Sequence, residues 1–127
     1  MATYLDSLMD DRERIERALT AQIEAEAARV RDLQADVASY ANTLDQQIVR
    51  LMIFRGIYGR SAQETLLAET DVEEASKPHT SAVQELATHQ RILQALQEAL
   101  IKLKQGQSLD AATTGEARVT VADILES

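Results

Sequence analysis

One pair of residues has the chemistry and spacing of a metal site on a helix. Glu85 and His89 stand four residues apart, so on a helix their side chains share one face. A carboxylate and an imidazole are ligands that zinc or iron accepts, but a site needs further ligands, and the chain has 2 His and 0 Cys. His89 also continues an apolar stripe between Leu86 and Leu93. We expect a histidine beside the core and no metal, cofactor or catalytic residue, with a metal-dependent helical-bundle enzyme as an alternative.

Two other short patterns favour ordinary structural roles. The acidic run at 69–74 lacks the glycine and the ligand spacing of a calcium loop, so it predicts a solvated helix face or a docking patch for a basic partner. Gly56 and Gly59 match the clamping loop of KH domains only as letters, because those domains need a β-sheet. The chain has no Walker loop, dinucleotide-binding glycine motif or nucleophile elbow. We therefore expect a protein that is not an enzyme.

The charge pattern argues against nucleic acid as a partner. The chain has 13 basic and 21 acidic residues and a net charge of -8. Phosphate backbones attract clusters of basic residues, but even residues 31–60 carry only four basic and three acidic side chains. The N-terminus lacks the pattern of a signal peptide, and no apolar run approaches the roughly 18 residues of a membrane span. We expect a chain made in the cytoplasm that does not cross a membrane.

The segment from Ile48 to Tyr58 is richer in apolar residues than one helix stripe requires. Eight of its eleven residues are apolar, whereas one heptad seam needs about three. Exposed apolar patches mark interaction sites, and aromatic residues flanked by arginine make good anchors. We expect a docking surface here, unless residues 56–80 fold back and cover it as an internal cap. The predicted partner-binding residues of this segment are Ile53, Phe54, Arg55, Ile57 and Tyr58.

The spacing of apolar residues predicts the helix that carries this segment. The chain has 4 Gly and 1 Pro, and neither type occurs before Gly56. A sandwich or barrel needs regular turn residues, so these folds are excluded, and without Cys so is a disulfide scaffold. Capping arrangements at Thr3 and Ser7 favour one helix over residues 7–55. Apolar residues recur in it every seven positions, at Ile23, Val30, Val37, Leu44 and Leu51.

The residues that follow predict a second arm of similar length. A turn over 56–60 and a capping box at 61–64 open a second helix. Pro78 lacks an N–H and disfavours helix at the preceding residue, so we expect a break there and a third helix over 80–105, ended by Gly106. Because the two arms match in length, the sequence predicts an all-α fold, a long antiparallel helical hairpin whose second arm is broken near Pro78.

Residues 107–127 differ in composition from the hairpin domain at 1–106. The stretch 108–115 is small and polar, as in a linker, and the alternation at 118–121 is typical of a short strand. We expect an extended C-terminal tail that docks on a neighbouring chain. The partner-binding residues predicted in this tail are Arg118, Val119, Val121, Ile124 and Leu125.

A hairpin of two helices buries too little apolar surface to be very stable as a single chain. We therefore expect a multi-chain helical assembly, with a monomeric three-helix bundle as the alternative. The sequence favours a non-enzymatic structural or assembly protein that oligomerises through its hairpin and docks by its tip and tail. Its expected partners are copies of itself and a larger assembly, for which a virus particle is one setting. A soluble coiled-coil adaptor or chaperone that binds a partner's helix is the alternative function.

Overall fold

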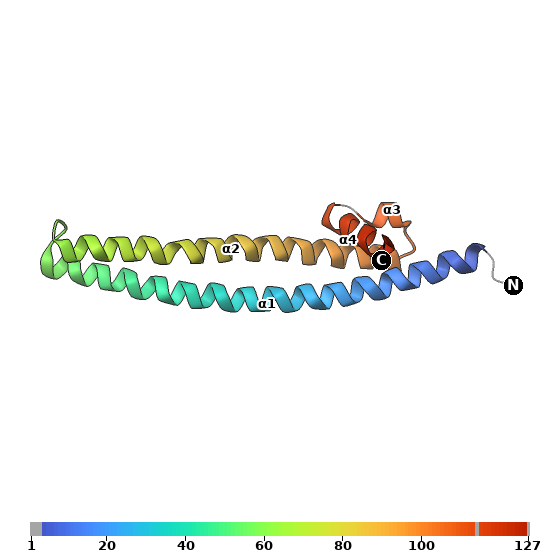
Figure 1. The fold of residues 1–127 in the computed structure, drawn as a ribbon. Coiled ribbons are helices and arrows are strands. Elements are labelled where there is room, and N and C mark those ends of the chain that lie inside the picture. Colours follow the sequence, from blue (N-terminus) through green and yellow to red (C-terminus); the bar gives the residue numbers. More distant parts are fainter. Residues whose placement is uncertain (1–3, 114, 127) are drawn as a thin grey trace. The chain divides into compact units, whose positions relative to one another are not determined.

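The computed structural model shows an all-α protein built on two long helices (Figure 1). It describes the backbone at residues 4–113 and 115–126, and among these residues it contains no strand. Side chains are described from Asp11 onward, except at 109, 110, 114, 116 and 124–127. The helices in chain order are α1 (Tyr4–Tyr58), α2 (Gln63–Lys104), α3 (Leu109–Ala112) and α4 (Gly115–Glu126).

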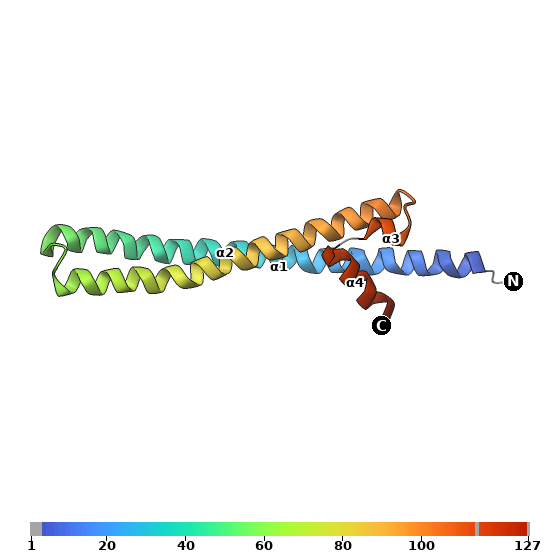
Figure 2. The same cartoon turned by 90° about the horizontal axis from the view of Figure 1, so that it is seen from above.

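The chain divides into two compact units, to which α1 and α2 both contribute. Unit 1 comprises residues 1–30 and 88–127, and unit 2 comprises residues 31–87. Within each unit the segments of α1 and α2 run antiparallel, as the two views in Figures 1 and 2 show. The prediction of an all-α helical hairpin is therefore confirmed.

Unit 1 has three layers because α3 and α4 lie over its α1–α2 pair (Figure 2). Ala117 and Val121, one turn apart on α4, are buried against side chains from both long helices. This third layer closes an apolar core around the pair. The buried core residues of unit 1 are Ile15, Leu19, Leu96, Ala99, Leu103, Ala112, Ala117 and Val121.

The end of α2 matches the predicted stop at Gly106. This glycine has a φ of 87°, a backbone conformation that other residues rarely adopt. The Gly106 N–H donates to the Leu103 carbonyl at 3.0 Å, and the Gln107 N–H donates to the Lys102 carbonyl at 3.1 Å. These two bonds form a Schellman motif. The Arg12 guanidinium of α1 donates to the carbonyls of Leu103 and Gln107 at 2.6 and 2.5 Å, so it satisfies acceptors at this helix end.

The expected break near Pro78 is wrong, because α2 runs without interruption from Gln63 to Lys104 with Pro78 inside it. An internal proline removes one backbone hydrogen bond and costs about 3 kcal/mol. The Pro78 ring is exposed, so water can hydrate the carbonyl that loses its donor. Ala68 and Ala82 are buried on either side of it. Packing of α2 along its length in unit 2 therefore outweighs the local preference against helix.

The expected extended tail is also wrong, because residues 115–126 form helix α4. A strand would place Val119 and Val121 on one face, whereas Val121 is 3% exposed and Val119 is 63% exposed. A lone strand also leaves its backbone donors and acceptors unpaired. In α4 these groups pair internally, and the four-residue spacing of Ala117 and Val121 fits the core of unit 1.

Unit 2 is a hairpin of two helices closed by the loop at 59–62. The predicted turn lies slightly later than expected, since Gly56 belongs to α1 and Gly59 has a φ of 87°. The buried Thr65 hydroxyl donates to the carbonyl of Gly59 at 2.7 Å and lies 3.3 Å from that of Phe54. This side chain thus ties the first turn of α2 to the end of α1.

Candidate docking site

An apolar surface covers the outward side of α1 at the tip of unit 2. Val49, Ile53 and Ile57 are four residues apart, and Met52 is three residues after Val49, so all four share one helix face. Their side chains are between 52% and 66% exposed, whereas Leu51, on the side toward α2, is 8% exposed. We call these four residues the α1 outer face.

Gly56 leaves a gap among the side chains of the α1 outer face. A Cβ atom added at Gly56 would meet no heavy atom within 4 Å. By helical spacing Gly56 lies between Met52, Ile53 and Ile57. The surface therefore alternates bulky side chains with a position where another backbone can approach closely.

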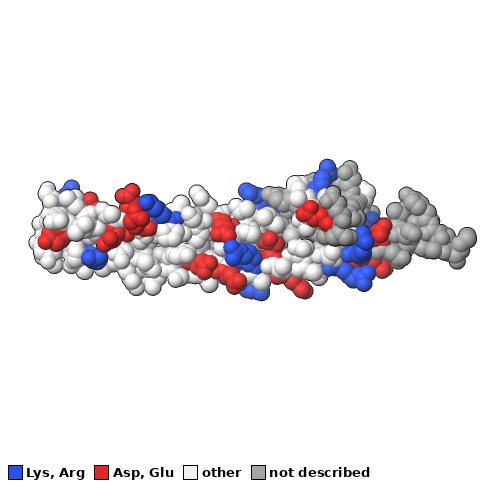
Figure 3. All heavy atoms as spheres, viewed as in Figure 1, with Lys and Arg blue, Asp and Glu red and all other residues white. Residues whose placement is uncertain are grey.

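Ion pairs to α2 occupy the sides of this surface. Arg50 donates to Asp71 at 2.9 Å, and Arg55 donates to Glu69 at 3.1 Å. The side chains involved are each between two fifths and half exposed, so each pair contributes little free energy of folding. Their consequence is electrostatic, because the arginines beside the apolar face are already neutralised by α2. Figure 3 shows the tip, at the left, as mainly uncharged surface with small neighbouring groups of both signs.

Two aromatic residues link the outer face to the α2 side of the tip. The Phe54 and Tyr58 rings meet edge to face, with centroids 5.6 Å apart and planes at 82°. The Arg50 guanidinium carbon lies 5.0 Å from the centroid of the Phe54 ring. Phe54 is half-buried, and Tyr58 is 51% exposed. Phe54 thus packs against both Tyr58 and Arg50.

The structure brings the five residues predicted at the tip together but divides their roles. Ile53 and Ile57 lie on the outer face, and Tyr58 is exposed at the end of α1. Phe54 packs against Tyr58, and Arg55 is paired with Glu69. The alternative of an internal cap over 56–80 would bury this surface, whereas Ile53 and Ile57 are 52% and 66% exposed.

The residues predicted to bind a partner at the tip did not include Val49 and Met52. Val49 lies four residues before Ile53, and Met52 lies three residues after Val49, and this spacing was the available signal. It was not decisive because the segment is apolar around most of its circumference. On α2, the consecutive residues Leu66 and Leu67 are also more than half exposed.

The tail residues predicted to bind a neighbour all lie in α4. Val121 is buried in the core of unit 1, so it is not free to bind another chain while α4 is folded in this way. The exposed Arg118 side chain donates from Nε to the Thr113 carbonyl at 3.3 Å, and Val119 is exposed. The side chains of Ile124 and Leu125 lie outside the described residues.

In the structure, the His89 side chain of the candidate metal pair contacts Glu26 of α1. His89 Nδ1 lies 2.9 Å from Glu26 Oε2, and both side chains are mostly buried in unit 1. Glu85 is exposed. Among the side chains that the structure describes, no three of His, Asp or Glu gather where they could hold a metal ion.

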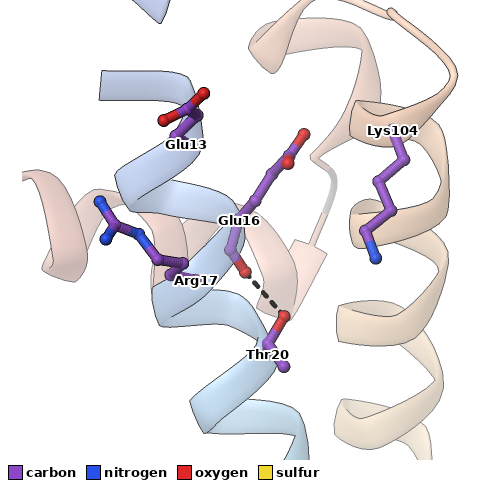
Figure 4. Close-up of a pocket in the computed structure, with 5 residues that line it drawn as sticks. All are labelled: Glu13, Glu16, Arg17, Thr20 and Lys104. Carbon is purple, nitrogen blue, oxygen red and sulfur yellow. Dashed lines mark hydrogen bonds between the residues drawn. The ribbon is translucent and has the colours of Figure 1, made fainter. Parts of the chain in front are cut away.

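An open hollow on unit 1 has a volume of about 420 Å³ (Figure 4). It is lined by residues of both signs from α1 and by one lysine from α2, and the Thr20 hydroxyl donates to the Glu16 carbonyl at 2.9 Å. Its lining is largely exposed, so it lacks the enclosed apolar walls of most small-molecule sites. The lining residues are Glu13, Glu16, Arg17, Thr20 and Lys104.

None of the described helices combines the length and the hydropathy that crossing a membrane requires. No protein-family model, curated protein or solved structure matches the chain.

Proposed function

We propose that this protein is a non-enzymatic structural or assembly protein that docks on protein partners through the α1 outer face. The observation that supports this role is the exposure of four large aliphatic side chains on one helix face, at Val49, Met52, Ile53 and Ile57. Single exposed apolar residues are common, but a contiguous group of this kind marks an interaction site. The tail has no part in the proposal, because α4 packs on its own unit.

The size of the surface indicates how it would be used. Burying the exposed part of one such side chain contributes about 1 kcal/mol, so the four together supply on the order of 4 kcal/mol. Association costs at least about that much in lost translational and rotational freedom. One contact through this face is therefore weak, and many copies acting together bind firmly. A multi-copy particle, such as a virion, is one setting in which this would operate.

A second candidate function is that of an adaptor or chaperone that holds a partner's amphipathic helix. Met52, 64% exposed, favours it, because a flexible thioether side chain adapts to partners of different shape. The two functions differ in the partner, which is a copy of this chain in the first and a foreign helix in the second.

Sedimentation velocity over a range of protein concentrations tests the assembly role. The wild-type chain is expected to associate as concentration rises, and Ile53→Lys with Ile57→Lys is expected to abolish association. Far-UV circular dichroism should show unchanged helix content, because both side chains are exposed. Val83→Lys on α2, 41% exposed, is the matched control and should associate like the wild type. A wild-type chain that stays monomeric throughout would contradict the assembly role.

A further inference from the structure

We infer that the occupant of the α1 outer face is the same face of a second copy of this chain, packed antiparallel about a two-fold axis. The axis passes between Ile53 and Gly56. This inference rests on the proposed assembly role and adds the partner and the geometry to it. Three features of the face support it, namely the sizes of its side chains, the order of the charges along it and its length.

The first feature is the match of large and small residues under antiparallel pairing. A two-fold interface uses one patch twice, so the patch must complement itself. When Ile53 of one copy lies over Gly56 of the other, the two-fold axis repeats this contact, so it occurs twice. Met52 and Ile57 lie on opposite flanks of the face, so each faces its own counterpart in the second copy. The space above Gly56 is open, so it can receive the isoleucine.

The second feature is the order of charges along α1. Asp45 lies one turn before Val49 on the same face, and Arg60 follows the last turn of α1. Both side chains are exposed. Antiparallel copies bring the acidic end of one face toward the basic end of the other, whereas parallel copies bring like charges together.

The neighbouring arginines do not oppose this contact. Arg50 and Arg55 are held by Asp71 and Glu69 of their own chain, so the sides of the face carry little net charge. For a chain with a net charge of -8, a neutral surface is the place where a second copy meets least repulsion.

The third feature is the length of the face. From Val49 to Ile57 the helix rises by about 12 Å, which suits two helices that cross at an angle rather than a long coiled coil. The face has four large side chains, whereas each side of a standard interface contributes about 20–30 residues. We therefore expect a reversible pair, which a covalent trap can capture.

Cysteine cross-linking tests this arrangement cleanly because the chain has 0 Cys. Ile53→Cys lies close to the axis, so mild oxidation should link two copies, several-fold more than in the control Val83→Cys. Met52→Cys and Ile57→Cys should each link to itself, and mixing the two should give no gain, since antiparallel copies bring each flank of the face onto the same flank of the other copy. Sedimentation velocity on the wild type is run beside these reactions.

Each other outcome overturns a defined part of the inference. Linking of Met52→Cys to Ile57→Cys above the linking of either variant with itself would show a parallel pair, in which opposite flanks of the face meet. Linking of Ile53→Cys to Leu67→Cys would place α2 of the second copy on the face instead. Either result leaves the assembly role standing if the wild type associates. A wild type that stays monomeric, with no link above the control, removes the inference and the assembly role together.

Discussion

Units 1 and 2 are built from the same two helices but bury their apolar residues to different extents. Twelve large hydrophobic side chains are exposed among the described residues, and only Ile101 and Val119 of them belong to unit 1. The other ten belong to unit 2. In unit 1, α4 adds Ala117 and Val121 to a core around Leu96. Unit 2, all of whose residues are described, consists of α1 and α2 alone.

The difference shows that a hairpin of two helices cannot cover its own outward sides. Two packed helices bury one stripe each and leave their outward sides to solvent, so an apolar outward side needs a third layer. Unit 1 takes that layer from its own chain. The outward side of α1 in unit 2 is apolar at Val49, Met52, Ile53 and Ile57, and no further helix of this unit covers it. This contrast is the reason for assigning the tip, rather than the tail, to a partner.

The largest expected effect separates the two units by stability. Leu96→Ala in the core of unit 1 should lower the free energy of unfolding by about 2–5 kcal/mol, because it removes a side chain that is 1% exposed and leaves a cavity. Ile53→Ala in unit 2 should change it by less than about 0.5 kcal/mol in dilute solution. Urea unfolding followed by circular dichroism measures both. Equal losses would show that the outer face is buried in the free chain.

A smaller effect is expected from the proline of unit 2. Pro78→Ala should raise the free energy of unfolding by about 1–3 kcal/mol, because alanine restores a backbone donor and relieves the ring's clash with the preceding turn. Hydrogen exchange measured by mass spectrometry should show the added protection in peptides of α2 around this position. Thr80→Ala, also at an exposed helical position, is the control and should gain at most about 0.7 kcal/mol. If Pro78→Ala instead lowers the free energy of unfolding, the proline stabilises the shape that α2 adopts at this position.

The sequence allowed the helices to be predicted better than their ends and partners. The seven-residue repeat identified α1, and Val30 and Leu51 of that repeat are buried. The break at Pro78 was predicted from local preference, which packing outweighed. The strand at 118–121 was predicted from β-branched residues, although the spacing of Ala117 and Val121 already allowed a helix face.

The docking surface, too, could be predicted only in part from the sequence. The sequence predicted that the segment 48–58 carries more apolar residues than one seam can bury. The seven-residue repeat assigned Leu51 to the seam and left Ile53 outside it, in keeping with exposures of 8% and 52%. It left open whether residues 56–80 would cover the side that carries Ile53. That depends on where α2 packs, and contacts such as the Arg50–Asp71 pair form only in the folded unit.

The smallest effect concerns two glycines, one in each unit, that should respond in opposite directions to the same change. Gly106→Ala should lower the free energy of unfolding by about 1 kcal/mol, because alanine disfavours the φ of 87° that ends α2. Gly56→Ala should raise it by about 1 kcal/mol, because Gly56 lies inside α1, where alanine is the better helix former.

Steric clashes do not affect this comparison, because the Cβ atom that alanine adds at either glycine would meet no neighbouring heavy atom within 4 Å. Urea unfolding gives the sign of each effect, and hydrogen exchange assigns it to peptides near the substituted residue. If both variants gain stability, Gly106 does not hold the left-handed conformation that closes unit 1. If both lose stability, α1 ends before Gly56, and the α1 outer face is not one continuous helical surface.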